Sequence, residues 1–433
     1  MMIAELIATG DELRTGALVD SNSAHIAARL ETLGIVVSRH TTVGDDLDQL
    51  ADVFRDVGQR ADVAIVTGGL GPTSDDRSAE AAALAAGRQL VFDPAAFRVT
   101  ERFYTRRKRP MAASNRKQAM LPESARFIDN PTGTAPGFHM ALGQAQFFFL
   151  PGVPGEMRRM LAASVLPDLA ARLGDERQAG LLQTLTTFGL PESVVGDRVA
   201  DFADAFPEYT LGFRAKFPEI QIKLYGNGPS RGFDPGRLDQ AVAWIARRME
   251  ERLLAPDETT LEKVVGQLLG EHGATLAVAE SCTGGLIGHR LTNVSGSSDY
   301  FLLSAVTYAN SAKQRVLGVP AEILETHGAV HEQTARAMAR GVRELAGATY
   351  GLATTGIAGP SGGTREKPVG TVCIGLATPA ETVAQRFNFF FDNRQAHKSM
   401  FAAAALDMLR LELMGFAPQA AGGKLAVGAT DAR

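Results

Sequence analysis

Short apolar runs alternate with amphipathic stretches over roughly the first 170 residues. The run IAELIAT is followed by DSNSAHIAARLETLG, in which Ile26, Leu30 and Leu33 recur at helical spacing and Gly34 ends the pattern. IVVSRHTTV, DDLDQLADVFRDVGQR and VAIVTGG continue the alternation, and QFFFLPGVPGEM repeats it later in the chain. Strands and helices that alternate in this way predict a doubly wound parallel sheet with helices on both faces.

The next stretch has a different pattern. LLQTLTTFGL and EIQIKLYGNG are typical of strands, and PESVVGDRVADFADAF and RLDQAVAWIARRMEERLL are typical of helices. The second helix places Val242, Ile245 and Met249 on one apolar stripe. These elements predict a small α+β domain without a catalytic cluster, which we interpret as a spacer or a dimerisation unit.

A third pattern begins after LAPDETT, where Pro256 precedes the helical stretch LEKVVGQLLGEHG. TLAVAES, FLLSAVTYA, YGLATTG, VGTVCIGLA and VAQRFNFFF predict about five strands, and RQAHKSMFAAAALDMLRLEL predicts a long final helix. The whole chain is therefore expected to be α/β, with domains at residues 1–170, 171–256 and 257–417. Residues 418–433 are rich in Gly and Ala without periodicity, and we expect an unordered tail there.

Composition and charge exclude several classes of protein. The chain has 433 residues, a formal net charge of −4 and only two cysteines, Cys282 and Cys373. This charge favours neither direct nucleic-acid binding nor an anionic membrane, and two cysteines provide neither a disulfide framework nor a four-cysteine zinc site. No signal peptide is expected at MMIAELIATGDELRTG, and no apolar run is long enough for a membrane span. We therefore expect a cytoplasmic protein.

Four unusual loops follow strands in the first domain: TGDELRTG, TVGDD, TGGLGPTSDD and LPGVPGE. The carboxyl ends of parallel strands share one edge of a sheet, so these loops are expected to converge. Clustered carboxylates at such an edge predict a divalent metal site. The alternative is that each Asp-Asp pair only caps a helix. The predicted metal ligands are Asp11, Asp45, Asp75, Asp76 and Glu156.

Glycines in the third loop predict a phosphate cradle beside the carboxylates. Gly68, Gly69 and Gly71 let the backbone approach a phosphate, and a helix predicted after Thr73 offers its N-terminal amides. A Gly-Gly pair is also common in ordinary turns. The loop matches neither a Walker A motif nor a dinucleotide fingerprint.

The stretch AESCTGG in the third domain predicts a nucleophile. TLAVAES is a buried strand by its pattern, and CTGGLIGHRLTN is expected to start a helix at once. Ser281 would then stand at the turn above the backbone amides of Cys282 and Thr283, which could bind an oxyanion, and Gly284 belongs to the same predicted substrate contact. The alternative, equally favoured by position, is that Ser281 merely caps the helix.

A base is needed to activate this serine. His289, His327 and His331 do not stand in an acidic relay motif, which disfavours a Ser-His-Asp triad. The stretch TYANSAK offers Lys313 as a general base, provided that burial lowers its pKa, and Tyr308 as a proton donor to departing ammonia. The alternative for Lys313 is an ordinary solvated lysine. Cys282 is not expected to be the nucleophile, because no cation is placed to keep it as a thiolate.

A loop dense in Gly and Pro, TTGIAGPSGGTREKPVG, follows a later strand. Its backbone amides, the hydroxyls of Thr354, Thr355 and Ser361 and the cations Arg365 and Lys367 suit a phosphate monoester. The alternative is a flexible connection, although such loops inside compact domains are usually functional. The predicted substrate contacts are Thr355, Gly356, Gly359, Ser361, Gly362, Gly363 and Thr364.

These motifs together resemble the CinA (competence/damage-inducible protein A) family over nearly the whole chain. GDELRTGALVDSN, TGGLGPTSDD, TAPGF and LPGVPGEM are similar to its front half, and AESCTGG, TYANSAK and TTGIAGPSGGTREKPVGTV to its back half. The resemblance implies a molybdopterin-binding-like front domain with metal-dependent ADP-ribose pyrophosphatase activity and a KH-like linker domain. It implies a nicotinamide mononucleotide deamidase at the back, with Ser281, Tyr308 and Lys313 as the catalytic set.

The same resemblance implies Mg, Mn or Co in the front domain, no cofactor in the back domain, and a homodimer. Nicotinamide mononucleotide and ADP-ribose would be the substrates. Two alternatives remain open: a nucleotide-binding scaffold for DNA processing during competence, and a pterin-binding protein of molybdenum-cofactor assembly. The sequence departs from the family pattern at Arg14, Ser304 and Ser361, where a leucine, a glycine, and an acidic residue or glycine are expected.

Overall fold

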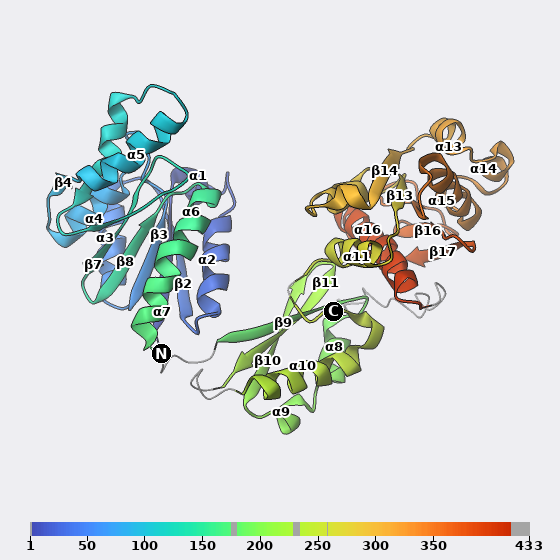
Figure 1. The fold of residues 1–433 in the computed structure, drawn as a ribbon, viewed down its shortest axis with the longest axis horizontal. Coiled ribbons are helices and arrows are strands. Elements are labelled where there is room, and N and C mark those ends of the chain that lie inside the picture. The colour runs from blue at the N-terminus through green and yellow to red at the C-terminus, as the bar shows by residue number, and fades with distance from the viewer. Residues whose placement is uncertain (1, 175–179, 228–233, 258, 417–433) are drawn as a thin grey trace. The chain divides into compact units, whose positions relative to one another are not determined.

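A computed structural model describes residues 2–174, 180–227, 234–257 and 259–416, and the predicted tail lies outside them. The chain forms two compact units (Figure 1). The first contains the front domain with short segments of the middle stretch, and the second contains most of the middle stretch and the back domain. Both are mixed α/β, which confirms the predicted fold class.

The front domain is built on a six-stranded sheet in the order β2-β1-β3-β8-β7-β6. The first four of these strands are parallel, and β7 and β6 are antiparallel additions at one edge. The strands are β1 (Ile3–Thr9), β2 (Val36–Val43), β3 (Val63–Thr67), β6 (Arg126–Ile128), β7 (Gly137–Leu142) and β8 (Ala145–Leu150). A separate two-stranded sheet pairs β4 (Leu90–Phe92) with β5 (Met120–Pro122).

Helices cover both faces of this sheet, as the alternating pattern predicts. One apolar cluster joins α3 and α4 to the sheet, and another joins α2, α6 and α7 to its opposite face. The loop after β3 runs on to Ser78 before α4 begins, so the helix expected after Thr73 starts later than predicted. The helices are α1 (Asp11–Arg14), α2 (Ser21–Glu31), α3 (Leu47–Gly58), α4 (Ser78–Ala86), α5 (Pro94–Arg106), the 3-10 helix η1 (Ala113–Ala119), α6 (Pro154–Met160), the π-helical turn η2 (Leu161–Val165) and α7 (Leu166–Leu173).

The middle stretch forms a four-stranded sheet in the order β10-β11-β9-β12. Its first predicted helix is divided in two, because the backbone leaves the helical region at Val199. Its second ends at Met249, because Glu250 adopts a positive φ of 54°, and the predicted end of this helix instead forms a 3-10 turn and β12. The elements are β9 (Leu181–Phe188), α8 (Glu192–Arg198), α9 (Phe202–Ala205), β10 (Tyr209–Lys216), β11 (Glu219–Gly226), α10 (Pro235–Met249), η5 (Glu250–Arg252) and β12 (Leu253–Ala255).

The back domain has a five-stranded sheet in the order β14-β13-β15-β16-β17, in which the first three strands are parallel. α11, α12 and α16 cover one face, and α13, α14 and α15 pack on the other. The strands are β13 (Leu276–Glu280), β14 (Phe301–Val306), β15 (Tyr350–Gly356), β16 (Thr371–Ala377) and β17 (Thr382–Asn388). The helices are α11 (Leu261–Glu271), α12 (Leu286–Thr292), η6 (Ser297–Asp299), α13 (Asn310–Leu317), α14 (Ala321–His327), α15 (Glu332–Ala346) and α16 (Arg394–Leu413).

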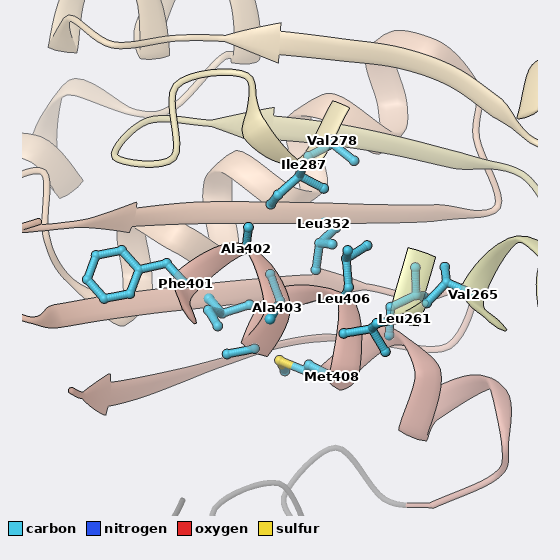
Figure 2. Close-up of a cluster of buried hydrophobic side chains, with 14 of the residues drawn as sticks. Leu261, Val265, Val278, Ile287, Leu352, Phe401, Ala402, Ala403, Leu406 and Met408 are labelled. Atoms are coloured by element: carbon cyan, nitrogen blue, oxygen red, sulfur yellow. The ribbon is translucent and has the colours of Figure 1, made fainter. Parts of the chain in front are cut away.

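Helix α16 is the centre of the back-domain core. Figure 2 shows its Phe401, Leu406 and Met408 among side chains from α11, β13 and β15. It is buried almost all round, and even its Asp407 and Arg410 are buried, joined by an ion pair of 2.7 Å. Such a helix can be stable only inside a domain. Among the described residues, no helix has the length and apolar character needed to cross a membrane.

Candidate active site

The site of the back domain lies at the carboxyl edge of three parallel strands. β13 ends at Glu280, and its neighbours β14 and β15 end at Val306 and Gly356. The backbone N–H of Ser281 donates to Thr354 O at 3.0 Å, continuing the ladder one residue beyond the strand. Loops far apart in sequence are thereby brought together at Ser281.

A five-residue turn, residues 281–285, separates β13 from α12, so the expectation of an immediate helix was wrong. Gly284 and Gly285 have φ values of 62° and 94°, a left-handed backbone that favours glycine. Helical geometry therefore begins only at Leu286.

Glu280 caps α12, and the sequence interpretation did not include it. Its carboxylate accepts the backbone N–H groups of Gly285 at 2.9 Å, Ile287 at 3.1 Å and Gly288 at 2.9 Å. The hydroxyl of Ser304, one of the departures from the family pattern, donates to Glu280 Oε1 at 3.1 Å. Since this buried carboxylate satisfies the helix start, Ser281 is free of the capping role. The sequence does contain a signal for this cap, because Glu280 is an acidic residue at the end of an otherwise apolar strand.

Ser281 contacts Lys313 directly. Lys313 Nζ lies 3.0 Å from Ser281 Oγ, 2.8 Å from Thr307 O and 3.0 Å from Tyr308 O. The lysine side chain is 0% exposed, so it is not the solvated lysine of the alternative interpretation. Burial lowers the pKa of Lys313, because the ammonium loses its hydration. The structure therefore joins a serine hydroxyl to an amine that favours its neutral form more than an ordinary lysine does.

The backbone after Ser281 offers oxyanion donors. Among the hydrogen bonds of the described residues, the N–H groups of Cys282 and Thr283 donate to no oxygen, although both lie close enough to the Cys282 sulfur to act on the pKa of its thiol. The N–H of Gly284 is already bonded to Ser281 O. The Cys282 side chain points into the apolar core, where burial raises the pKa of its thiol to about 12. Cys282 therefore contributes its backbone to the site rather than a thiolate.

Tyr308 lies at the mouth of the site. Its side chain is 61% exposed, and its hydroxyl accepts a hydrogen bond from Arg394 Nη2 at 3.0 Å. The described hydrogen bonds do not join this hydroxyl to Ser281 or Lys313, although the Tyr308 backbone carbonyl does hold Lys313. The structure thus brings together two members of the predicted set and leaves the third hydroxyl apart from them.

Arg394 is a second residue that the sequence interpretation missed. It begins α16, and its Nη1 donates to Gly359 O at 2.7 Å, which ties the glycine-rich loop to the Tyr308 hydroxyl. One turn later, Lys398 Nζ lies 3.5 Å from the position of a β-carbon built on Gly284. One cation of this helix, Lys398, therefore borders the turn 281–285, and the other, Arg394, contacts the glycine-rich loop and Tyr308. Basic residues just after the Asn393 cap were the signal for both in the sequence.

The glycine-rich loop presents its tip to solvent, but several predicted contacts are used internally. Thr355 is buried and donates to Ala329 O at 2.7 Å, and the buried hydroxyls of Thr283 and Thr354 pair with each other at 2.8 Å. The expectation that the Thr354 and Thr355 hydroxyls face a phosphate was therefore wrong. Lys367 Nζ is bonded to His327 O. The exposed predicted positions are Ser361, Gly362, Gly363, Thr364 and Arg365, while Gly359 is buried and Gly356 half-buried.

In the front domain, the four strand-end loops do converge. They surround a cavity of about 580 Å³ at the carboxyl ends of β1, β2, β3 and β8. Gly68 and Gly69 have φ values of 106° and 65°, so their backbone can adopt the turn that lines the cavity. The lining includes the predicted residues Asp45, Gly68, Gly69, Gly71, Asp75, Asp76 and Glu156; Asp11 and Thr73 are outside it.

Four of the five predicted metal ligands, Asp11, Asp45, Asp76 and Glu156, accept local hydrogen bonds. Among the described residues, no group of three or more His, Cys, Asp or Glu side chains is placed to hold a metal ion. Arg14, a departure from the family pattern, occupies the Asp11 carboxylate at 2.9 Å. Asp45 Oδ2 accepts from Asp11 N at 3.1 Å, and Glu156 Oε2 accepts from Asn130 Nδ2 at 2.7 Å. Asp76 Oδ2 accepts from Thr73 N at 2.9 Å and also from the Thr73 hydroxyl.

Negative charge is nevertheless concentrated at this edge. The pKa of Asp45 is raised, first by burial and then by the neighbouring carboxylates of Asp11, Glu12 and Asp75. A cation in the cavity would relieve this repulsion. Since Mg²⁺ commonly takes only one or two carboxylates and completes its shell with water and substrate phosphates, these residues suit a metal that arrives with a phosphorylated ligand, not a preformed metal centre.

Comparisons with known proteins cover both halves of the chain. Residues 5–171 match the family model described as probable molybdopterin binding domain, and residues 258–413 match the CinA C-terminal domain. A CinA-like protein of Desulfosudis oleivorans is 52% identical over 95% of this chain and 100% of its own length. A second, from Desulforapulum autotrophicum, is 46% identical over 95% and 99%. The crystal structure of competence/damage inducible protein CihA from Agrobacterium tumefaciens, 38% identical, covers 36% of this chain and 93% of that one, with a TM-score of 0.35.

Proposed function

The chain belongs to the CinA-like protein family, and from this premise we propose that its back domain is a serine amidohydrolase that converts nicotinamide mononucleotide to nicotinate mononucleotide and ammonia. The observation that carries the proposal is the buried contact of 3.0 Å between Lys313 Nζ and Ser281 Oγ. An amine with a lowered pKa beside a serine is the arrangement needed for a general base that lacks histidine.

The chemistry follows from the hydrogen bonds of Lys313. As a neutral amine it can direct its two N–H groups at the carbonyls of Thr307 and Tyr308, which leaves its lone pair facing the Ser281 hydroxyl. Ser281 Oγ attacks the carboxamide carbon while Lys313 takes its proton. The amides of Cys282 and Thr283 would stabilise the oxyanion of the tetrahedral intermediate.

Collapse of this intermediate breaks the C–N bond, and the protonated Lys313 supplies the proton that ammonia needs to depart. Water then attacks the acyl-serine ester with Lys313 again as base, which releases the carboxylate and restores Ser281. Tyr308 stays a proposed relay that passes the proton from Lys313 to the leaving group. Its hydroxyl would have to approach the substrate on binding, and catalytic hydrogen bonds often form only in the substrate complex.

A phosphate would be anchored at the mouth of the site. Lys398 borders the turn 281–285 at Gly284, and Arg394 contacts Gly359 in the glycine-rich loop. The exposed residues 361–363 of that loop offer backbone amides beside Arg394. Guanidinium and ammonium groups next to free backbone amides suit a phosphate monoester. We therefore propose that this region binds the 5′-phosphate and orients the reacting amide.

The test is release of ammonia by the purified full chain. Nicotinamide mononucleotide should be hydrolysed, and nicotinamide riboside should have a far lower kcat/KM, because phosphate binding orients the amide. A scaffold that only binds nucleotides would release no ammonia from either compound, and that result would refute the proposal. Equal kcat/KM values for both compounds would instead refute the proposed phosphate-binding site.

A second proposed activity belongs to the front domain, because its cavity combines glycines of positive φ with carboxylates at the edge of a parallel sheet. We propose that it hydrolyses a nucleoside diphosphate ester such as ADP-ribose, with Mg, Mn or Co bound through Asp45, Asp75 or Asp76 together with the substrate phosphates. When bound, such a cation supplies charge neutralisation at the pyrophosphate. A pterin ligand of the same cavity is the alternative, and ADP-ribose turnover distinguishes the two.

A further inference from the structure

A dense basic segment lies outside both proposed sites. Between residues 98 and 117 the chain has eight lysine and arginine residues and a single acidic one, Glu101, although the whole chain carries a net charge of −4. The whole-chain charge, from which nucleic-acid binding was disfavoured, conceals this local concentration. The segment covers the later part of α5, the turn that follows it, and most of η1.

The spacing of the arginines in α5 destabilises this helix by charge repulsion. Arg98, Arg102 and Arg106 are spaced by four residues, so they share one face of the helix, where like charges repel. The helix C-terminus favours Arg106 but not Arg98. Asp129 neutralises only Arg102, at 2.5 Å, and among the described residues Arg98, Arg106 and Arg107 form no ion pair. An anionic ligand would offset this repulsion.

A pocket of about 230 Å³ opens between this face of α5 and the loop 130–133. Arg102, Arg106 and Arg107 line it together with Phe103 and Thr132. The Arg107 guanidinium lies 3.9 Å from the centre of the Phe103 ring, and this stacking restricts the arginine. Three arginine side chains therefore line one small hollow, and two of them, Arg106 and Arg107, form no ion pair among the described residues.

The opposite wall of the pocket is fixed by its own hydrogen bonds. Asn130 Oδ1 accepts the backbone N–H groups of Thr132 at 3.1 Å and Gly133 at 2.8 Å, so the loop is ordered before any ligand binds. Gly133 lines this pocket, and the next residue, Thr134, lines the front-domain cavity. The two hollows are thus neighbours.

We propose that this pocket is a second phosphate site of the front domain, which binds a phosphate or pyrophosphate group of a small phosphorylated ligand. The site does not depend on the proposed ADP-ribose hydrolysis. Guanidinium groups bind phosphate oxygens through paired, charge-assisted hydrogen bonds, and three arginine side chains line this hollow. A nucleic-acid strand fits less well, because Asp129 and Glu156 interrupt the positive surface toward the cavity, where a polymer needs consecutive cations.

The test compares two pairs of substitutions in the full chain, with inorganic pyrophosphate as the probe in calorimetry at low ionic strength. Arg106→Ala/Arg107→Ala removes two exposed pocket residues, and Lys108→Ala/Arg109→Ala removes the same charge just outside the pocket. The pocket pair should weaken binding about tenfold or more, and the control pair less than about twofold. Pyrophosphate should also protect Arg106 and Arg107, but not Arg109, from phenylglyoxal in mass spectrometry.

Two results would overturn the proposal. Equal weakening by both pairs, or none by the pocket pair, would show that the segment acts only as diffuse charge. Binding of a labelled oligothymidine that both pairs abolish, without protection of Arg106 and Arg107 by pyrophosphate, would assign the segment to single-stranded nucleic acid instead. Because neither readout uses ADP-ribose turnover, failure here is distinguishable from failure of the proposed front-domain activity.

Discussion

The ammonium of Lys313 has three donors, and the structure gives it three acceptors: Ser281 Oγ and the carbonyls of Thr307 and Tyr308. This explains how a lysine that is 0% exposed is tolerated in the fold. When Lys313 deprotonates, all three contacts remain and only one hydrogen bond reverses. The neutral amine still donates to the two carbonyls, and its lone pair accepts from the Ser281 hydroxyl. The residue is therefore held in one place in both protonation states, as a base that must accept and return a proton requires.

Substitution of the nucleophile and base should be strongly non-additive. Ser281→Ala and Lys313→Ala should each remove nearly all amidase activity, and the double variant should be no worse, since the pair acts as a unit. Cys282→Ala should retain most activity and resist thiol-alkylating reagents, because the buried thiol, with its pKa raised to about 12, does no chemistry. A folded but inactive Cys282→Ala protein, alongside an active Ser281→Ala protein, would reverse the assignment.

The proposed amidase activity should increase as the pH rises. Only neutral Lys313 can take the serine proton, so kcat/KM should rise with pH and level off above the pKa of Lys313, which burial places below the ordinary 10.5. Stability should follow the same titration. Between the lowered pKa of the folded state and the ordinary pKa of the unfolded chain, the unfolded chain binds more protons, so the free energy of unfolding should increase with pH. In the Lys313→Met variant, the free energy of unfolding should no longer rise with pH over this range. If the rise persists in the variant, another residue is responsible for the titration.

At the scale of elements, the turn between β13 and α12 depends on one carboxylate. Glu280 accepts three backbone N–H groups and the Ser304 hydroxyl while buried at the end of β13. The turn that carries Ser281 is therefore attached at both ends, by the ladder to Thr354 and by the cap on α12. Glycines permit the conformation, and Glu280 selects it.

Glu280→Gln should destabilise the chain by about 3 kcal/mol, because an amide replaces an acceptor of four hydrogen bonds and turns N–H groups toward N–H donors. Ser304→Ala, which removes one donor and keeps the carboxylate, should cost about 1 kcal/mol. Chemical denaturation would measure both. Equal stability of Glu280→Gln and the wild type would mean that the cap does not hold the turn.

Periodicity predicted the long elements, and it failed where local backbone chemistry decides. The strands around β13 and β15 and the whole of α16 follow from apolar runs that tertiary burial reinforces. The start of α12 was predicted too early, because the left-handed conformations of Gly284 and Gly285 leave no mark in hydrophobicity. The β6–β7 edge was not predicted, since short strands carry little signal of their own; β7 pairs antiparallel to β8, and β6 antiparallel to β7.

In the candidate site, too, some residues could be predicted from the sequence and others could not. Ser281 and Lys313 were identified from their places after strands, because parallel strands bring their carboxyl ends to one edge. Arg394 was missed because it comes from a helix 113 positions beyond Ser281 in the numbering, and only the packing of α16 brings it to the loop at Gly359. Thr355 was assigned to substrate from its loop position, whereas its hydroxyl is used inside the domain.

At the scale of the molecule, the two proposed sites occupy separate units of one chain. The front cavity belongs to the first unit, and the Ser281–Lys313 pair belongs to the second. The proposed front activity uses a metal, whereas the proposed amidase uses only side chains and backbone. The two activities should therefore respond independently to treatments that affect one kind of chemistry.

Excess chelator should abolish ADP-ribose cleavage by the full chain and leave ammonia release unchanged. Asp76→Ala should act like the chelator, and Ser281→Ala should have the opposite effect, because each removes a group from one site only. Both reactions can be followed on the same preparation. Full pyrophosphatase activity in excess chelator would show that the front-domain activity needs no metal. Loss of both activities in either variant would mean that the two sites are not independent.

The burial of α16 has a consequence for synthesis on the ribosome. Most of the core of the back domain packs against this helix, which follows all of the domain's strands along the chain. While residues 394–413 are still being translated, the sheet lacks the element that covers one face, and Arg394 has not reached the glycine-rich loop at Gly359. The front domain is complete more than 200 residues earlier. A message truncated before α16 should therefore yield a folded front domain attached to an amidase that never assembles.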